Sequence, residues 1–269
     1  MRGLSRTSLA EVEERFNAVA GSADLGTLAE ELFSVADLLD REHGLRRNLS
    51  DPARPAAQKA QVVRVLLEGK VSDAALETVA AAVSAKWARS RDLADALERL
   101  GVIAAAAEAE AQGRLDDVED ELFRFGRIVA SNLELYRTLT APAAPEQAKR
   151  ELLNSLLAEK VAPTTLRLVT QPVLHPRGRS LESGLEEFGK LVAAQRQRLV
   201  AVVRSAVALS EGQKQRLATW LRTSYGRDVH LNVEVDPRVL GGFSVRIGDD
   251  LIDTTIAGRI EEVRRRLAG

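Results

Sequence analysis

LRRNLSDPARPAAQKAQVVRVLLEGKV, residues 45–71, recurs in diverged form as LYRTLTAPAAPEQAKRELLNSLLAEKV, residues 135–161. The two stretches align without a gap at an offset of 135 − 45 = 90 residues. The alternative is chance similarity between two Leu- and Ala-rich helices. Shared prolines and lysines argue against it, because these residues do not recur merely through the composition of a helix core. Each proline also marks the same helix connection in both stretches. We therefore predict an internal duplication. The identical residues of the first stretch are Leu45, Arg47, Leu49, Pro52, Ala53, Pro55, Lys59, Leu66, Leu67, Lys70 and Val71.

The register of the repeat continues on both sides of these stretches. Upstream, Glu31-Leu32-Phe33 matches Glu121-Leu122-Phe123, and downstream a slip of two residues aligns Arg91 with Arg179. A period of this length exceeds a solenoid unit and is typical of a compact bundle of several helices. The repeat thus predicts two helical bundles, residues 1–100 and 101–197.

Both bundles show helical spacing of apolar residues, whereas the last part of the chain does not. Leu28, Leu32, Val35 and Leu39, for example, form one apolar stripe beside the acidic pair Glu30-Glu31. Residues 198–269 instead combine alternating strands with short helices. The predicted fold class is mainly α: two helical bundles related by duplication, followed by a small α/β carboxyl-terminal domain.

The order of elements in the carboxyl-terminal domain follows from its sequence pattern. A strand is expected over residues 199–209, followed by a helix that Ser210 and Gln213 open as a capping box. Apolar residues then alternate over 229–235 and 243–247, which predicts two further strands before a turn at 248–250. A final helix is expected from about Thr255.

Composition excludes several classes of protein. The 269 residues carry a net charge of −1 with acids and bases interspersed, so no overall field favours nucleic acid or an anionic membrane. The chain has no cysteine, which removes disulfides, zinc ribbons and thiolate chemistry. The amino terminus lacks the pattern of a secretory signal, and no apolar stretch is long enough to span a bilayer. Cytoplasm is therefore the expected compartment.

Neither catalytic residues nor ligands for a metal or cofactor are predicted. His43, His175 and His230 lie in different segments, without a companion at relay or ligand spacing. The chain contains no phosphate loop, nucleophile elbow or HExxH pattern. Two features leave alternatives open. The basic stretch over residues 175–179 could hold a phosphate or form a solvated loop, and Gly241-Gly242 could admit a ligand or form a turn.

A combination of weak motifs near the carboxyl terminus makes the chain recognisable. VEVDPRVLGGFSVRIGDDLIDTTIAGRIEEVRRRL, residues 233–267, resembles the signature of the delta subunit of F-type ATP synthases, called the oligomycin-sensitivity-conferring protein in mitochondria. PRGRSLESGLEEF, residues 176–188, is similar to the Gly-Arg-Leu segment of that family. The positions that carry the signature are Gly178, Arg179, Asp236, Gly241, Gly242, Ile247, Gly248, Asp249, Ile252, Asp253 and Thr255.

The resemblance covers the chain from about residue 100 to its end as an ordinary delta subunit. The first 100 residues are the departure, because they add a diverged copy of the bundle, as the longer actinobacterial-type members carry. In that copy Ser90-Arg91-Asp92 stands where the second has Gly178-Arg179-Ser180. The resemblance implies a peripheral, non-catalytic stator subunit held at the cytoplasmic face of the plasma membrane by its partners in ATP synthesis and proton transport.

In the family, the helical bundle holds amino-terminal segments of alpha subunits and the small domain grips the b subunits. A partner helix laid into an apolar groove is the expected binding mode. The resemblance places this groove between the first and fifth helices of the second copy. We expect this copy to engage the catalytic head. The candidate partner-binding residues are Ile103, Ala107, Leu166, Val169 and Val173.

Two functions from other classes compete with the stator. A free-standing adaptor could use two duplicated bundles to bind helical peptides in two places. A phosphate-handling enzyme could use Arg177 and Arg179. Co-purification with ATP synthase subunits distinguishes the first from a stator, and stabilisation by nucleotides or phosphate distinguishes the second.

Overall fold

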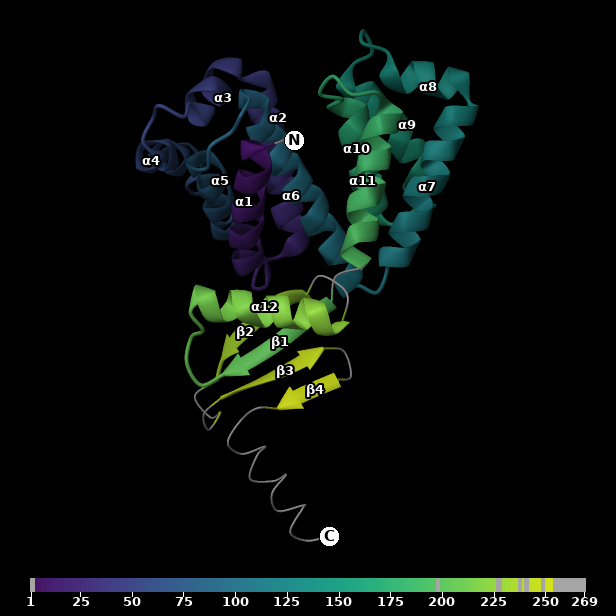
Figure 1. The fold of residues 1–269 in the computed structure, drawn as a ribbon. Coiled ribbons are helices and arrows are strands. Elements are labelled where there is room, and N and C mark those ends of the chain that lie inside the picture. Colours follow the sequence, from purple (N-terminus) through teal and green to yellow (C-terminus); the bar gives the residue numbers. More distant parts are fainter. Residues whose placement is uncertain are drawn as a thin grey trace. The chain divides into compact units, whose positions relative to one another are not determined.

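The computed structural model describes residues 3–196, 199–225, 229–236, 239, 242–247 and 250–253. These residues divide into two compact units, one reaching to Gln195 and the other beginning at Arg196 (Figure 1). The first unit is helical and the second contains a sheet, as the sequence predicts. Within the described ranges, no helix is both long and apolar enough to cross a membrane.

The first unit consists of helices α1 to α11 with short connections. Their bounds are Leu4–Ala20 for α1, Leu25–Arg41 for α2, His43–Ser50 for α3, Ala56–Leu67 for α4, Asp73–Ser84 for α5, Ser90–Ala111 for α6, Leu115–Ser131 for α7, Leu133–Thr140 for α8, Glu146–Leu157 for α9, Pro163–Leu174 for α10 and Leu181–Arg196 for α11.

The duplication is visible in the helix bounds themselves. Each of α2, α3, α4 and α5 begins and ends 90 residues before its counterpart among α7, α8, α9 and α10. The same offset carries α1 onto residues 94–110, which lie within α6. Helix α6 also corresponds to α11, so it closes the first copy and opens the second. The boundary expected after residue 100 therefore falls inside a continuous helix, because both copies share it.

A repeated glutamate caps equivalent helices in the two copies. Glu31 accepts hydrogen bonds from the backbone nitrogen (2.8 Å) and the hydroxyl (2.5 Å) of Ser72, the N-cap of α5. Glu121 accepts a bond of 2.9 Å from the backbone nitrogen of Ala162, the N-cap of α10, and one of 2.5 Å from the hydroxyl of Thr165. Free N–H groups at a helix start need such acceptors. The Glu-Leu-Phe match thus reflects a shared cap.

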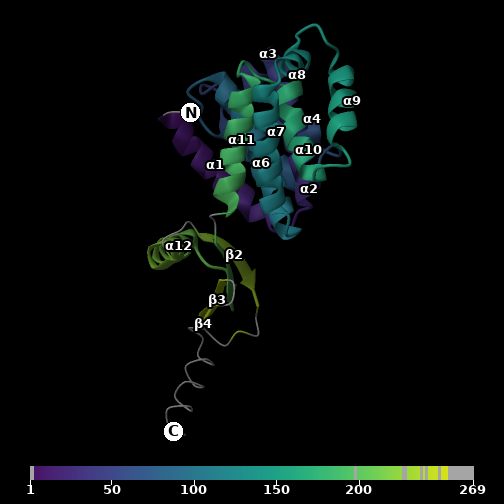
Figure 2. The same cartoon turned by 90° about the vertical axis from the view of Figure 1, so that its right-hand side faces the viewer.

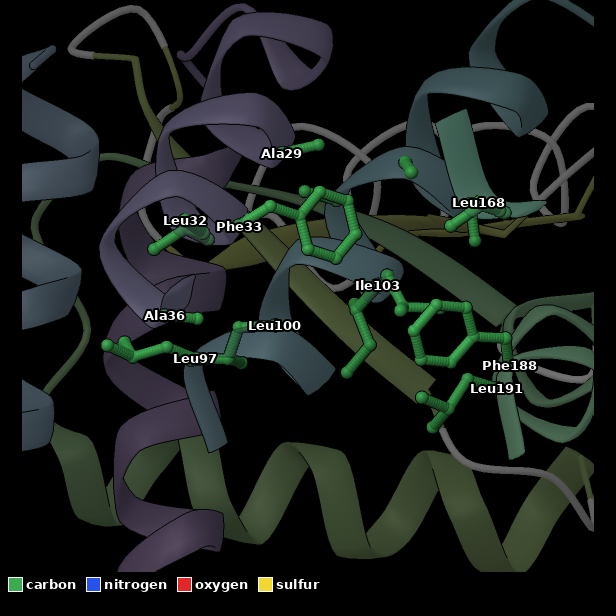
Figure 3. Close-up of a cluster of buried hydrophobic side chains, with 14 of the residues drawn as sticks. Ala29, Leu32, Phe33, Ala36, Leu97, Leu100, Ile103, Leu168, Phe188 and Leu191 are labelled. Carbon is green, nitrogen blue, oxygen red and sulfur yellow. The ribbon is translucent and has the colours of Figure 1, made fainter. Parts of the chain in front are cut away.

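One apolar core runs through both copies of the helical unit (Figure 3). Helices α2 and α6 lie against each other along their length, and the ring of Phe33 sits on Gly101. A Cβ atom built at Gly101 would lie only 2.8 Å from the nearest ring carbon of Phe33. Glycine at this position therefore permits the close approach of the two helices.

The second unit is a four-stranded sheet with one described helix beside it. The strands are β1 (Leu199–Ser205), β2 (Val229–Val235), β3 (Phe243–Ile247) and β4 (Asp250–Asp253), in the order β2-β1-β3-β4. β1 pairs with β2 in parallel and with β3 antiparallel, and β4 pairs antiparallel with β3. Val203, Leu221 and Val245 are fully buried between the sheet and the helix α12 (Glu211–Tyr225).

Several predictions for the second unit can be compared with the structure. Ser210 and Gln213 form the predicted capping box, each accepting a bond from the backbone nitrogen of the other. The first strand ends at Ser205 rather than at residue 209, because the following residues turn toward the start of α12. The helix expected from Thr255 lies outside the described residues.

Candidate partner-binding surfaces

The structure places the five candidate groove residues on α6 and α10. Ile103, Val169 and Val173 are buried in the core of the helical unit. Ala107 and Leu166 are partly buried. Sequence periodicity alone did not separate these two groups, because α6 packs against helices of both copies and therefore has few exposed positions (Figure 2).

An open hollow in the first copy is lined by the counterparts of Glu108, Thr164 and Arg167, which lie beside the candidate groove residues of the second copy. It has a volume of about 380 Å³ and lies between the end of α1 and the starts of α2 and α5. The hollow is lined by small and polar side chains. The lining residues are Ala18, Val19, Ser22, Ala23, Asp24, Thr27, Ser72, Asp73, Ala74 and Glu77.

Ionic contacts occupy the equivalent region of the second copy. Glu108 on α6 accepts from the hydroxyl of Thr164 at 3.4 Å and pairs with Arg167 at 2.7 Å. Arg167 also pairs at 3.1 Å with Glu30 on α2, which belongs to the first copy. The two copies thus differ at this groove: the first has a hollow, whereas the second has an ion cluster to which α2 contributes.

The basic stretch after α10 holds the two copies together. Arg177 is buried, pairing at 2.8 Å with Asp37 of α2 and at 3.3 Å with Glu98 of α6. Arg179 pairs with the same Glu98 at 2.5 Å and with Glu187 at 2.8 Å. Carboxylates therefore neutralise both arginines that the sequence offered as candidate phosphate ligands. Sequence reasoning missed these carboxylates, since Asp37 lies 140 residues away from Arg177.

Burial perturbs the ionisable groups of this cluster. It raises the pKa of the Asp37 carboxyl, against the opposing effect of His175 and Arg177, and it raises the pKa of Glu98 against the effect of Arg177 and Arg179. Burial lowers the pKa of His175, whose Nε2 lies 3.1 Å from Asp37. Such shifts are frequent at catalytic sites but also arise in buried structural ion pairs. Here the ionisable groups pair with one another across α2, α6 and the segment after α10, as in a buried structural ion cluster.

Two signature glycines adopt backbone conformations that suit glycine. Gly178 has a φ of 67° and follows Arg177, which itself has a φ of 49°. This left-handed turn brings both flanking arginines onto the acidic residues. Gly242 has a φ of 76° and immediately precedes β3. Asp253 lies on β4 opposite Ser244, whereas Gly241 and Gly248 lie outside the described residues.

No group of metal-binding side chains occurs among the described residues. The described residues form a helical unit and a small α/β unit. A family model described as "ATP synthase delta (OSCP) subunit" matches residues 102–267. The chain belongs to this family. The matched residues comprise nearly all of the second copy and the small domain, and the first copy precedes them.

Relatives from actinobacteria match the chain over its whole length. An ATP synthase subunit delta of Thermobifida fusca is 54% identical over 269 residues, with 100% of both chains covered. Its counterpart in Streptomyces coelicolor is 53% identical over 270 residues, covering 100% of this chain and 98% of that one. The additional copy is therefore shared with these relatives.

Among solved structures, a chain of the mitochondrial ATP synthase hexamer of Toxoplasma gondii has 16% identity and a TM-score of 0.28. The match covers 62% of this chain and 95% of that chain. The family and the full-length relatives show that the chain is a non-catalytic subunit of the peripheral stalk of ATP synthase.

Proposed function

We propose that the chain links the catalytic head, through amino-terminal segments of alpha subunits, to the b subunits of the stalk. The observation that carries this proposal is the division into two compact units with separate cores, one helical and one built around a sheet. A link between two bodies needs a binding surface for each of them. The helical unit would bind the head, and the small domain would bind the stalk at the cytoplasmic face of the plasma membrane.

The mode of binding to the head would be a helix in a groove of the helical unit. In the second copy, Ala107 and Leu166 would contact the partner, while Ile103, Val169 and Val173 would support them from the core. The hollow between α1 and α5 favours the first copy as a second candidate, because the matching groove of the second copy contains the Arg167 ion cluster.

A matched pair of variants distinguishes the two grooves. Leu76 and Leu166 occupy equivalent positions on α5 and α10, and both are partly buried against the core. Leu166→Asp should weaken binding of the purified head if the second copy binds it, and Leu76→Asp should do so if the first copy does. Circular dichroism would verify that both variants fold. Equal binding by wild type and both folded variants would contradict both grooves.

The link itself is tested by co-purification. Tagged chain should bring down alpha, beta and b subunits from solubilised membranes, and removal of residues 199–269 should release the b subunits while the head stays bound. A tagged chain that brings down none of these subunits would refute the proposed function.

A further inference from the structure

Helix α2 has two buried faces, and the second of them holds the other copy. Its first face packs inside its own copy. Its second face contacts α6, α10 and the segment after α10. Phe33 lies on Gly101 of α6, Glu30 pairs with Arg167 of α10, and Asp37 pairs with His175 and Arg177 just after α10. The first face consists of Leu28, Leu32, Val35 and Leu39, and the second of Ala29, Phe33, Ala36 and Asp37, all buried.

Helix α7 has the same first face, but its second face is partly or fully exposed. Val118, Leu122, Phe125 and Val129 are buried like their counterparts on α2. The counterparts of the second face are Glu119, Phe123, Gly126 and Arg127, none of which is buried. Phe123 is 64% exposed, whereas Phe33, 90 residues earlier, is 2% exposed. In Figure 1, α7 lies at the right-hand side of the second copy, away from α2.

The exposure of Phe123 follows from the end of the repeat. The face of α2 is covered because a second copy follows it, but after α11 the chain continues into the strands of the small domain rather than into a third bundle. Full burial of a phenylalanine side chain is favourable, so an exposed ring at the position where the first copy has a buried contact residue is a candidate binding surface.

The charges along this face define the partner. Asp120 corresponds to Glu30 and carries the same negative charge. The partner should therefore place a basic residue against Asp120, as Arg167 lies against Glu30 of α2. Arg127 replaces Asp37, so the partner should be acidic there. The guanidinium of Arg127 lies 5.9 Å from the centre of the Phe123 ring, which holds the cation beside the apolar surface.

We propose that the stripe Asp120–Phe123–Arg127 of α7 binds a helix of another ATP synthase subunit, one that presents a basic, a small and an acidic residue in that order. The small residue takes the place that Gly101 has beneath Phe33. The exposed ion pair between Asp120 and Arg124 contributes little and can exchange for the partner's basic residue. The inference rests on the proposed function, because the partner belongs to the same complex.

Cysteine labelling tests this surface, because the chain contains no cysteine of its own. Ala130→Cys places a thiol on the proposed stripe, seven residues after Phe123. Ile128→Cys is the matched control, since residue 128 is exposed on the same helix but about 140° away from Phe123 around the axis. In the assembled complex, labelling at residue 130 should be about tenfold slower than in the free chain, and labelling at residue 128 should change little.

A second change shows whether the ring causes the protection. Adding Phe123→Ser to the Ala130→Cys variant should restore fast labelling, and the exposure of Phe123 means that folding does not depend on it. Fast labelling of residue 130 in the complex, equal protection of both thiols, or protection that survives Phe123→Ser would each overturn the stripe. Co-purification is measured on the same samples. A chain that fails to assemble with the other subunits would instead refute the proposed function, and with it the binding proposed for the stripe.

Discussion

The contact of Phe33 with Gly101 allows a stability prediction with an internal control. Gly101→Ala adds a methyl group whose carbon would lie 2.8 to 3.2 Å from three ring atoms of Phe33, which is itself buried in the core. Overpacking of this kind costs about 1–3 kcal/mol. Alanine in a helix interior regains about 1 kcal/mol over glycine. We therefore expect Gly101→Ala to lower the free energy of unfolding by about 0–2 kcal/mol.

Gly126→Ala supplies the control, because Gly126 also lies inside a helix, α7, and a Cβ there meets no atom within 4 Å. This variant should gain about 1 kcal/mol in free energy of unfolding. The helix term cancels between the two variants, so their difference of about 1–3 kcal/mol measures the close approach alone.

The assay is equilibrium unfolding in urea followed by far-ultraviolet circular dichroism, which reports mainly on the helical unit. Phe33→Leu removes the ring that the new methyl group would strike. The double variant Phe33→Leu with Gly101→Ala should therefore lose less free energy of unfolding than the sum of the losses of the two single variants. If Gly101→Ala and Gly126→Ala change the free energy of unfolding equally, Phe33 does not lie on Gly101. The packing of α2 against α6 would then need revision.

Three further predictions concern the caps and the buried cluster. Glu31→Ala should cost about 1–2 kcal/mol of unfolding free energy, because the carboxylate accepts two bonds from Ser72; an unchanged urea midpoint would exclude this cap. Arg177→Met should cost about 3–5 kcal/mol by leaving Asp37 buried without its arginine, and Arg177→Met combined with Asp37→Leu should recover part of that loss in the same assay. Burial lowers the pKa of His175, so the unfolded chain binds the proton more readily and stability should fall as pH drops below 6.5 toward the folded pKa. His175→Asn should flatten the melting temperature across that pH window, and a slope equal to that of wild type would contradict this.

The helical repeat could be predicted because it leaves identical residues at a fixed spacing. Prolines at residues 55 and 145 stand at the start of α4 and α9 in both copies. The repeated Lys59 could be recognised, but its role could not. It is buried and donates to the carbonyl of Ala85 just after α5, a contact between segments that no local pattern reveals. The shared helix α6 was also hidden, because the match of α1 to residues 94–110 contains few identical residues.

The candidate groove stays a prediction, and the structure shows only where its five residues lie. The family resemblance pointed to α6 and α10, but the apolar spacing of a helix is the same for a core face and for a groove. Ile103 and Leu166 could be separated only when α2 was seen to pack on α6 and the burial of each side chain was known. The ion pair between Arg177 and Asp37 joins residues 140 positions apart. Local sequence spacing therefore could not predict it.

The shared helix α6 has a mechanical consequence. Two bundles joined by a flexible linker would swivel about it, and a stator built that way would yield before it transmitted load. Here the joint is 22 residues of continuous helix, about 33 Å long, with its backbone hydrogen bonds running through the junction. We therefore expect a twisting load on one copy to pass to the other along this helix, so that the two copies respond as one body.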